Sequence, residues 1–378
     1  MTTITLRSPE TAIASLPYLL GFTPERSLIT ITTVDVDGRQ AVGLTTRVDL
    51  PAPGEDLEAF AAEYRSSVIS AMGRVPNASS VAVIVVDDTP AGPDQMAHVD
   101  LVDQVTRDLA PVGDILDVLY TDGDTYRSYL CTDPGCPCLA GAEISSAIKD
   151  SVAAEFVARG VAPAGSRSDL QRSWDAPGDA ARMEQVATWC AQASGEPLVD
   201  GYDSASPIDR AAAQLSVAQD AIDVLSSPAV IPPDVERRLV QVLTLANTDI
   251  RVRDALAWTA SRTPSPVQPV IADQLTRLGS TMPIEHREAV ATIAGLSRYL
   301  AGDGAQASIA VRQALAANPD ARLASMLDTA LAAGLPPQEY ASTMQSLSAE
   351  QAVGLTPLAQ ASPDPVHAAT TPAAAPAV

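Results

Sequence analysis

The feature that most constrains the fold of this chain is a change of hydrophobic period part-way along its 378 residues. As far as Cys138, short runs of strand length are interspersed with segments of helical spacing, whereas beyond it only helical spacing remains. Because one hydrophobic core rarely serves a chain of this length, we expect two domains, an α/β domain over residues 1–150 and an all-helical domain over residues 151–362. Residues 363–378 are rich in Ala, Pro and Thr without periodicity, which predicts a disordered tail.

The amino-terminal pattern predicts a mixed α/β sheet with helices packed on it. Two β-rich runs flank Asp37-Gly38, which is a strong signal for a β-hairpin. The run Val81–Val86 is apolar on both faces and therefore suits a central strand. The expected order is β-β-α-β-α-β-β, with strands at Leu28–Val36, Gln40–Leu50, Val81–Val86, Ile115–Tyr120 and Tyr126–Cys131 and helices at Asp56–Ala71 and Gln95–Leu109.

The carboxyl-terminal pattern predicts an irregular stack of helical hairpins, similar to tetratricopeptide arrays but without their regular period of about 34 residues. The best-marked pair is Asp303–Ala316 and Pro319–Ala333, with Asn318 as amino-terminal cap and Gly334 just past the end. An apolar stripe on each helix, which includes Met326 in the second, predicts an antiparallel hairpin. The other expected helices are Ile144–Arg159, Gly178–Ala193, Ile208–Leu225, Asp234–Leu245, Asp249–Ser261, Val267–Leu278 and Ile284–Ala301.

The acidic composition argues against several classes of partner. With 24 basic and 46 acidic residues, the net charge is −22, which repels phosphate backbones and anionic lipid headgroups. We therefore expect neither nucleic-acid nor membrane binding. The longest apolar run is far shorter than the about 20 residues of a membrane helix, and Met1–Glu10 lacks the pattern of a secretory signal. These features, together with four cysteines of which three are clustered, predict a soluble cytoplasmic protein.

Cys131, Cys136 and Cys138 form the most unusual local cluster of the chain. Thiolates so close in sequence can share zinc, which prefers four tetrahedral ligands in a structural site. A fourth ligand is not evident, and His98 is the most plausible completion although its spacing gives no support. The favoured alternative is a structural turn shaped by Pro and Gly, and reversible oxidation of the thiols is a third reading.

Three carboxylates follow the predicted strands of the sheet. Asp87 and Asp88 come directly after Val81–Val86, and Asp122 follows the next strand. Ligand crevices form at the carboxyl ends of strands in open α/β sheets, and carboxylates there suit Mg²⁺. The favoured alternative is that these residues serve turns and helix caps, where Asp is common.

Arg47 and Asp49 lie two residues apart, on the same face of a predicted strand. They are expected either to form an ion pair with each other or to bind a ligand. Elsewhere the sequence contains no phosphate-binding loop, no dinucleotide fingerprint, no nucleophile elbow and no paired histidines at helical spacing. The leading hypothesis is therefore a non-enzymatic module that binds a protein partner through its helical half. The alternatives are a Mg²⁺-dependent hydrolase with a carboxylate site at the sheet edge and a zinc or thiol sensor.

Several motifs spread along the chain resemble those of one known family. They are Arg7-Ser8-Pro9, Pro17–Pro24, Ser27-Leu28, Arg47–Pro51, Tyr126–Cys131, Gly160, Ser166-Arg167, Arg253-Asp254-Ala255, Tyr299–Gly304, Asn318-Pro319-Asp320 and Ala333–Pro337. Together they resemble the actinobacterial family catalogued as domain of unknown function 4192. This resemblance implies an actinobacterial or actinophage origin and a cytoplasmic setting, but it transfers no catalytic residue. Members usually have two adjacent cysteines where this chain has Cys136-Pro137-Cys138, and this departure weakens the expectation of a shared metal site.

Overall fold

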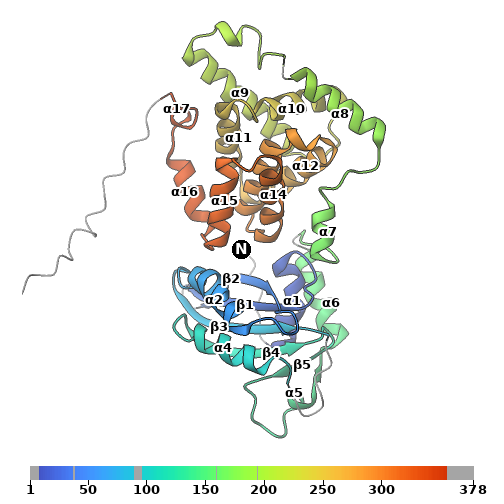
Figure 1. Cartoon of the computed structure of the whole chain (residues 1–378), viewed down its shortest axis with the longest axis vertical. Helices are drawn as coiled ribbons and strands as arrows, with labels where there is room; N and C mark the ends of the chain where they lie inside the picture. Colours follow the sequence, from blue (N-terminus) through green and yellow to red (C-terminus); the bar gives the residue numbers. More distant parts are fainter. Residues whose placement is uncertain (1–7, 37–38, 89–95, 159, 194, 356–378) are drawn as a thin grey trace, which may run out of the picture.

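The computed structural model describes residues 8–36, 39–88, 96–158, 160–193 and 195–355. It consists of an α/β half and an all-helical half, which lie one above the other in Figure 1. The predicted fold class is therefore confirmed. The expected hairpin turn at residues 37–38 and the expected tail over residues 363–378 lie outside the described residues.

The α/β half is built on a six-stranded sheet with the order β2-β1-β3-β4-β5-β6. Neighbouring strands are antiparallel except β3 and β4, which are parallel and are joined by the crossover helix α4 (Val99–Leu109). The strands are β1 (Ser27–Val36), β2 (Arg39–Asp49), β3 (Ala78–Val86), β4 (Asp114–Thr121), β5 (Thr125–Ser128) and β6 (Ala142–Glu143). The predicted hairpin is confirmed, since β1 pairs with β2 from Ser27 opposite Asp49 to Val36 opposite Arg39.

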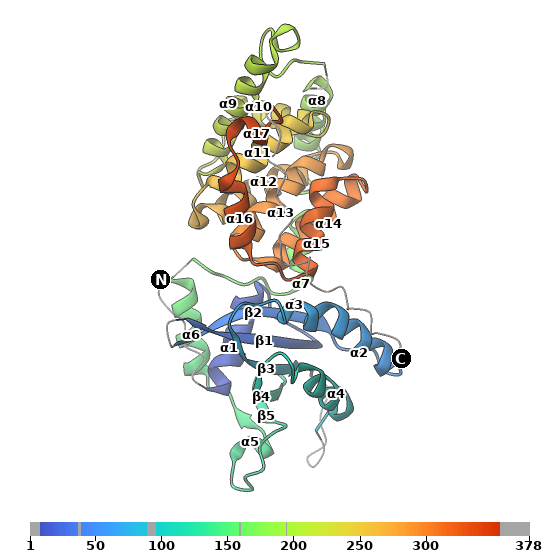
Figure 2. The same ribbon diagram turned by 90° about the vertical axis from the view of Figure 1, so that its left-hand side faces the viewer.

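Helices cover both faces of this sheet (Figure 2). One face carries α4 and the continuous helical segment α2 (Leu57–Tyr64), η1 (Arg65–Ile69) and α3 (Ser70–Met72), which was expected as a single helix. The other face carries α1 (Pro9–Leu20) and α6 (Ser146–Val157), which pack against each other. Adjacent strand residues point to opposite faces, so Leu28 joins the first core and Ile29 the second. As predicted, β3 is central, and Val83, Ile84 and Val85 are fully buried.

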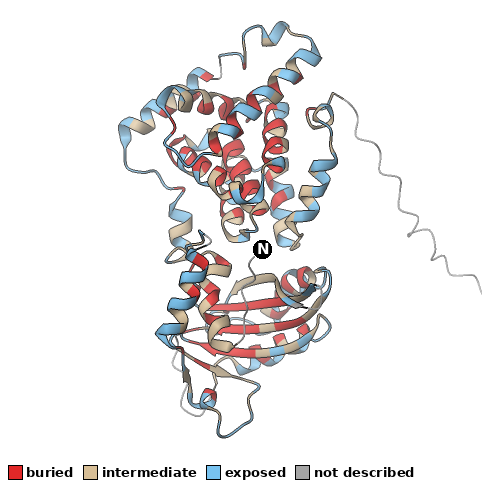
Figure 3. Ribbon diagram, turned by 180° about the vertical axis from the view of Figure 1, so that it is seen from behind, coloured by how far each residue is buried: buried red, intermediate tan, exposed pale blue. Residues whose placement is uncertain are grey.

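The helical half surrounds one central helix, α13 (Glu288–Leu300), whose side chains are buried on nearly every face. Figure 3 shows the buried residues concentrated in the interior of this half. Irregular helical stacking is loosely consistent with a tetratricopeptide-like arrangement. The remaining helices after α6 are α7 (Arg167–Arg172), α8 (Ala180–Ala193), α9 (Pro207–Leu225), α10 (Pro233–Leu245), α11 (Ile250–Arg262), α12 (Gln268–Thr281), α14 (Gly304–Ala317), α15 (Arg322–Ala332), α16 (Pro337–Ser346) and α17 (Ala349–Ala352).

Two details of the last predicted helix pair were wrong. Helix α15 begins at Arg322 and not at Pro319, because Asn318 closes a turn of its own in which its Oδ1 accepts a hydrogen bond from Asp320 N at 3.1 Å. Met326 is 66% exposed and does not belong to the buried stripe. The predicted helix end is confirmed, since Gly334 has a φ of +63° and its N–H donates to the carbonyl oxygen of Leu331 at 3.1 Å.

The two halves are in direct contact. Residues 21–23 pair with Ala164, whose N–H donates to the Gly21 carbonyl oxygen at 2.9 Å. The Arg74 guanidinium donates to the Ala333 carbonyl oxygen at 3.2 Å. Strand β2 is the edge of the sheet nearest the helical half in Figure 2. Within the described ranges, no helix combines the length and apolar character needed to cross a bilayer.

Candidate functional site

Asp87 lies at the carboxyl end of β3, at the edge where the parallel strands β3 and β4 end. Its side chain is fully buried, and its Oδ2 lies 2.7 Å from Nε2 of His98. The Arg26 guanidinium lies 3.7 Å from the other carboxylate oxygen. His98 occupies the position immediately before α4, so the crossover connection places an imidazole beside the strand end. A buried carboxylate therefore orients a histidine that remains 22% exposed.

The backbone is strained at both of these partners. Among the described residues, the non-glycine residues with positive φ are Arg26 at +39°, Asn77 at +57° and His98 at +56°. Residues with a side chain rarely adopt this left-handed backbone conformation. Such strain persists only where the surrounding structure imposes it. Two of the three strained residues, Arg26 and His98, contact the Asp87 carboxylate. The surrounding structure therefore imposes a strained backbone on both partners of Asp87.

Two tyrosines hold the segments around this pair. The Tyr120 hydroxyl donates to the Asp87 carbonyl oxygen at 2.9 Å, and the Tyr129 hydroxyl donates to the Ala97 carbonyl oxygen at 2.6 Å. Burial, together with the negative charge of Asp87, raises the pKa of Tyr120, so the hydroxyl stays protonated as a donor. The arrangement is chemically suited to proton transfer, because a carboxylate that holds one imidazole nitrogen leaves the other to accept or donate a proton.

The other two carboxylates proposed for Mg²⁺ have different surroundings. Asp88 is exposed, whereas Asp122 closes the turn after β4 and accepts hydrogen bonds from Asp124 N, Thr125 N and Thr125 Oγ1 at 2.7 to 3.0 Å. Burial acts to raise the pKa of Asp122, but the hydrogen bonds from Thr125 and Asp124 outweigh it and lower the value. Within the described part of the chain, the three aspartates do not gather into a group that could hold a metal ion.

The cysteines do gather. Their Sγ atoms all lie within 4.8 Å of one another between β5 and β6, where Cys138 belongs to the short helix α5 (Pro137–Ala140), and the Cys136 and Cys138 sulfurs are 2.8 Å apart. An Asp133 turn shapes the loop, since its Oδ1 accepts from Gly135 N at 2.9 Å and its carbonyl oxygen accepts from Cys136 N at 3.0 Å. Hydrogen bonds from Cys138 lower the pKa of the Cys136 thiol, whereas burial raises the pKa of Cys138 to about 12. All three are free thiols.

These distances are close to those of a zinc–thiolate site. Tetrahedral Zn²⁺ with bonds of about 2.3 Å separates its sulfur ligands by about 3.8 Å, so the Cys136 and Cys138 sulfurs would move apart by about 1 Å on binding. His98, the fourth ligand considered from the sequence, is not part of the cluster, because its Nε2 faces Asp87. The residues present supply three soft ligands and leave a fourth position for another donor.

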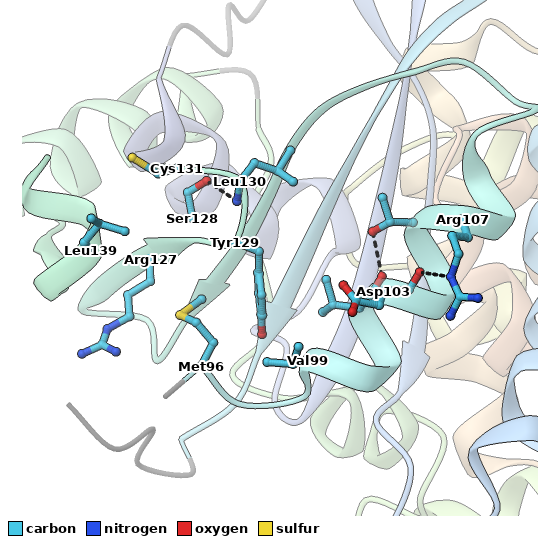
Figure 4. Close-up of a pocket in the computed structure, with 12 residues that line it drawn as sticks. Met96, Val99, Asp103, Arg107, Arg127, Ser128, Tyr129, Leu130, Cys131 and Leu139 are labelled. Atoms are coloured by element: carbon cyan, nitrogen blue, oxygen red, sulfur yellow. Dashed lines mark hydrogen bonds between the residues drawn. The ribbon is translucent and has the colours of Figure 1, made fainter. Parts of the chain in front are cut away.

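A pocket of about 740 Å³ lies beside the cluster, between α4 and the segment that follows β5. Cys131 belongs both to the thiol cluster and to the pocket wall. Figure 4 shows Tyr129 between Met96 and Val99, which form the apolar centre of the wall. The same Tyr129 hydroxyl fixes Ala97, so the pocket adjoins the segment that carries His98.

Arg47 and Asp49 form the pair considered from the sequence, with a guanidinium nitrogen 2.5 Å from the carboxylate. Arg47 Nε also donates to Ser27 Oγ at 2.7 Å, and the guanidinium carbon lies 5.9 Å from the centre of the Phe22 ring. The Arg47 side chain is only 12% exposed, whereas that of Asp49 is 76% exposed. The guanidinium is thus held in place from several sides.

The protein thus has two parts, an α/β half built on a mixed sheet and an all-α half. A carboxylate–histidine pair lies at the edge of the sheet, and a thiol cluster lies beside a pocket. A family model described as domain of unknown function, DUF4192, matches residues 9–338. The chain therefore belongs to the DUF4192 family. Neither the curated proteins nor the solved structures with which it was compared gave a match.

Sequence reasoning identified Asp87 but missed its partner. His98 was considered as a ligand for zinc and, for acid–base chemistry, had no visible partner in the sequence, and Tyr120 and Tyr129 were not considered as site residues. One signal could have linked the pair, since a polar residue at the start of the helix that follows a parallel strand is brought to that strand's carboxyl end. Nothing in the sequence marked Arg26, which reaches Asp87 from the start of another strand.

Proposed function

We propose that the chain is a zinc-binding protein that holds the metal on the thiolates of Cys131, Cys136 and Cys138. The observation that carries this proposal is the convergence of three free sulfurs within 4.8 Å. Zinc favours such soft ligands, and three protein ligands leave one position open to water or to an exogenous donor. Because Cys131 also lines the neighbouring pocket, a ligand bound there would approach the metal. Such an arrangement would suit a protein that senses zinc or the oxidation state of these thiols.

The experiment is measurement of bound zinc in the purified protein after incubation with zinc and gel filtration. We expect about one zinc per chain and loss of zinc in variants with Cys131→Ser, Cys136→Ser or Cys138→Ser. Cys190→Ala is the matched control, because Cys190 is buried in the helical half, outside the cluster. Absence of zinc from the wild-type protein, or equal loss in the control, would refute the proposal. Counting free thiols in parallel identifies the redox alternative, in which the cluster oxidises without metal.

A second candidate function, acid–base catalysis, is favoured by the 2.7 Å contact between Asp87 and His98 on a strained backbone. This replaces the three-carboxylate hypothesis with a carboxylate–histidine pair. Activated aryl esters are the simplest probe, and the expected result is hydrolysis that is lost in His98→Gln but kept in His286→Gln. Hydrolysis that is absent, or equal in both variants, would remove this candidate.

A protein partner for the helical half, in a cytoplasmic setting, stays our prediction. Its surface exposes isolated apolar side chains, of which Ile208 is 71% and Val230 83% exposed. Co-purification from the native host, compared between the wild type and Val230→Ser, tests the prediction.

A further inference from the structure

Three arginines from distant parts of the sequence meet where the two halves join. Arg47 belongs to β2, Arg167 is the first residue of α7 and Arg312 lies on α14. The pairing of Phe22 with Ala164 draws the start of α7 towards the sheet, and Arg47 lies against the same Phe22 ring. Helix α7 packs on α14. These contacts bring the three segments that carry the arginines to one junction.

Electrostatics supports this gathering. Burial lowers the pKa of Arg167, and the positive charges of Arg312 and Arg47 lower it further. Neighbouring like charges repel one another unless an anion lies between them. The structure therefore keeps two guanidinium groups near a third, partly buried one in a chain whose net charge is −22.

The three arginines differ in the partners they have. Arg47 is paired with Asp49, and Arg312 donates to Ser308 Oγ at 3.2 Å. Arg167 has neither an ion pair nor a hydrogen bond from its side chain to the described residues. Removing a charged group from water without a counter-charge is costly, so a partly buried arginine without a partner favours the binding of an anion.

We propose that Arg47, Arg167 and Arg312 bind a phosphate group at the junction of the two halves. The three guanidinium groups outnumber the Asp49 carboxylate that pairs with Arg47, and this excess of positive charge favours a phosphate group. Guanidinium groups bind oxyanions through paired N–H donors, and a ligand held by residues of both halves would fix one against the other. Inorganic phosphate is the simplest probe, and acetate tests whether a carboxylate group suffices.

The experiment is calorimetric titration of the zinc-free full-length protein with phosphate at constant ionic strength, together with thermal unfolding. We expect saturable binding, a higher Tm in phosphate than in chloride and weaker binding of acetate. Arg167→Gln should weaken phosphate binding at least about tenfold, which corresponds to the loss of one charge-assisted contact. Arg172→Gln is the matched control, since Arg172 lies on the same helix, pairs with Asp169 and is 62% exposed.

The stability of the phosphate-free protein distinguishes a binding role of Arg167 from a structural role. Without phosphate, Arg167→Gln should be at least as stable as the wild type, because the substitution relieves repulsion from Arg47 and Arg312. Should Arg167→Gln fail to fold, the exposed Arg312→Gln gives the same test of binding. Phosphate without effect beyond that of chloride, or equal binding by Arg167→Gln and Arg172→Gln, would overturn the proposal.

Discussion

His98 and Asp87 are joined by a contact of 2.7 Å between imidazole Nε2 and carboxylate Oδ2, although ten residues separate them along the chain. The carboxylate ends a central strand and is fully buried, while the imidazole precedes the helix that crosses to the next parallel strand. A buried carboxylate depends on its partners far more than an exposed one does, because water cannot replace them. The contact thus links the stability of the sheet edge to the position of the His98 imidazole.

Replacing His98 with Ala should therefore destabilise the protein by about 1 to 3 kcal/mol, because Asp87 loses a partner that water does not replace. Urea unfolding measures the loss. Adding Asp87→Asn removes the charge that needs the partner, so the double variant should lose less than the sum of the two single variants. His286→Ala, in the helical half, is the control. Losses that simply add would show that the two side chains do not depend on each other.

The three clustered thiols should differ in reactivity. Hydrogen bonds from Cys138 lower the pKa of Cys136, so a larger fraction of Cys136 is thiolate near neutral pH. Burial raises the pKa of Cys138 to about 12, so that sulfur remains a thiol. Iodoacetamide at pH 7 should modify Cys136 at least about tenfold faster than Cys138 in the metal-free protein, as measured by peptide mass spectrometry. Zinc should protect both residues, and equal rates for the two thiols would contradict the assignment.

A buried glutamate of the central helix should make stability depend on pH. Burial raises the pKa of Glu288 in spite of the nearby Arg253, so the folded state favours the protonated carboxyl more than the unfolded state does. Stability from this group is therefore complete below the ordinary pKa of 4.5 and is lost as the pH rises through the higher folded value. Glu288→Gln should raise Tm by a few degrees at pH 7 and leave it unchanged at pH 4. Glu285 is exposed, so Glu285→Gln should leave Tm unchanged at both pH values. A Glu288→Gln variant that is less stable than the wild type at pH 7 would contradict the prediction.

Local patterns predicted most of the fold, because each element buries a face that its own spacing defines. The hairpin of β1 and β2, the central position of β3 and the helices from α8 to α14 all follow from such spacing. Helix α1 was not expected, since Pro17 lies in its interior and normally disfavours a helix there. Burial of Ile13, Leu16 and Leu20 against the sheet outweighs that preference. Contacts between distant elements decided this case, and local spacing does not contain them.

The same limit applies to the candidate sites. Asp87 could be identified because the sequence pattern shows where the central strand ends. The three cysteines could be identified because they are close together in the sequence. The contact of Asp87 with Arg26 depends on the antiparallel pairing of β1 with β3, which brings Ser27 opposite Val86. Arg47, Arg167 and Arg312 lie more than one hundred residues from one another, and only contacts between distant elements bring the segments that carry them to one junction.

The contact between the halves can be tested at one glycine. Gly334 has a φ of +63°, and a Cβ built there would lie 2.8 Å from Ala71 Cβ and 3.0 Å from Leu44 Cδ2, both in the α/β half. Gly354 has a similar φ of +70°, but nothing lies within 4 Å of its Cβ position. Both Gly→Ala variants therefore carry backbone strain of about 1 kcal/mol, and only Gly334→Ala adds a clash across the junction.

Gly334→Ala should accordingly lose about 1 to 3 kcal/mol more than Gly354→Ala in urea unfolding. Limited proteolysis gives an independent measurement, because a loosened junction exposes the connection around Ala164 between α6 and α7. Cleavage there should be faster in Gly334→Ala and unchanged in Gly354→Ala. If the two variants behave alike, left-handed backbone strain accounts for the whole effect, and the close approach of Gly334 to Ala71 contributes nothing to holding the halves together.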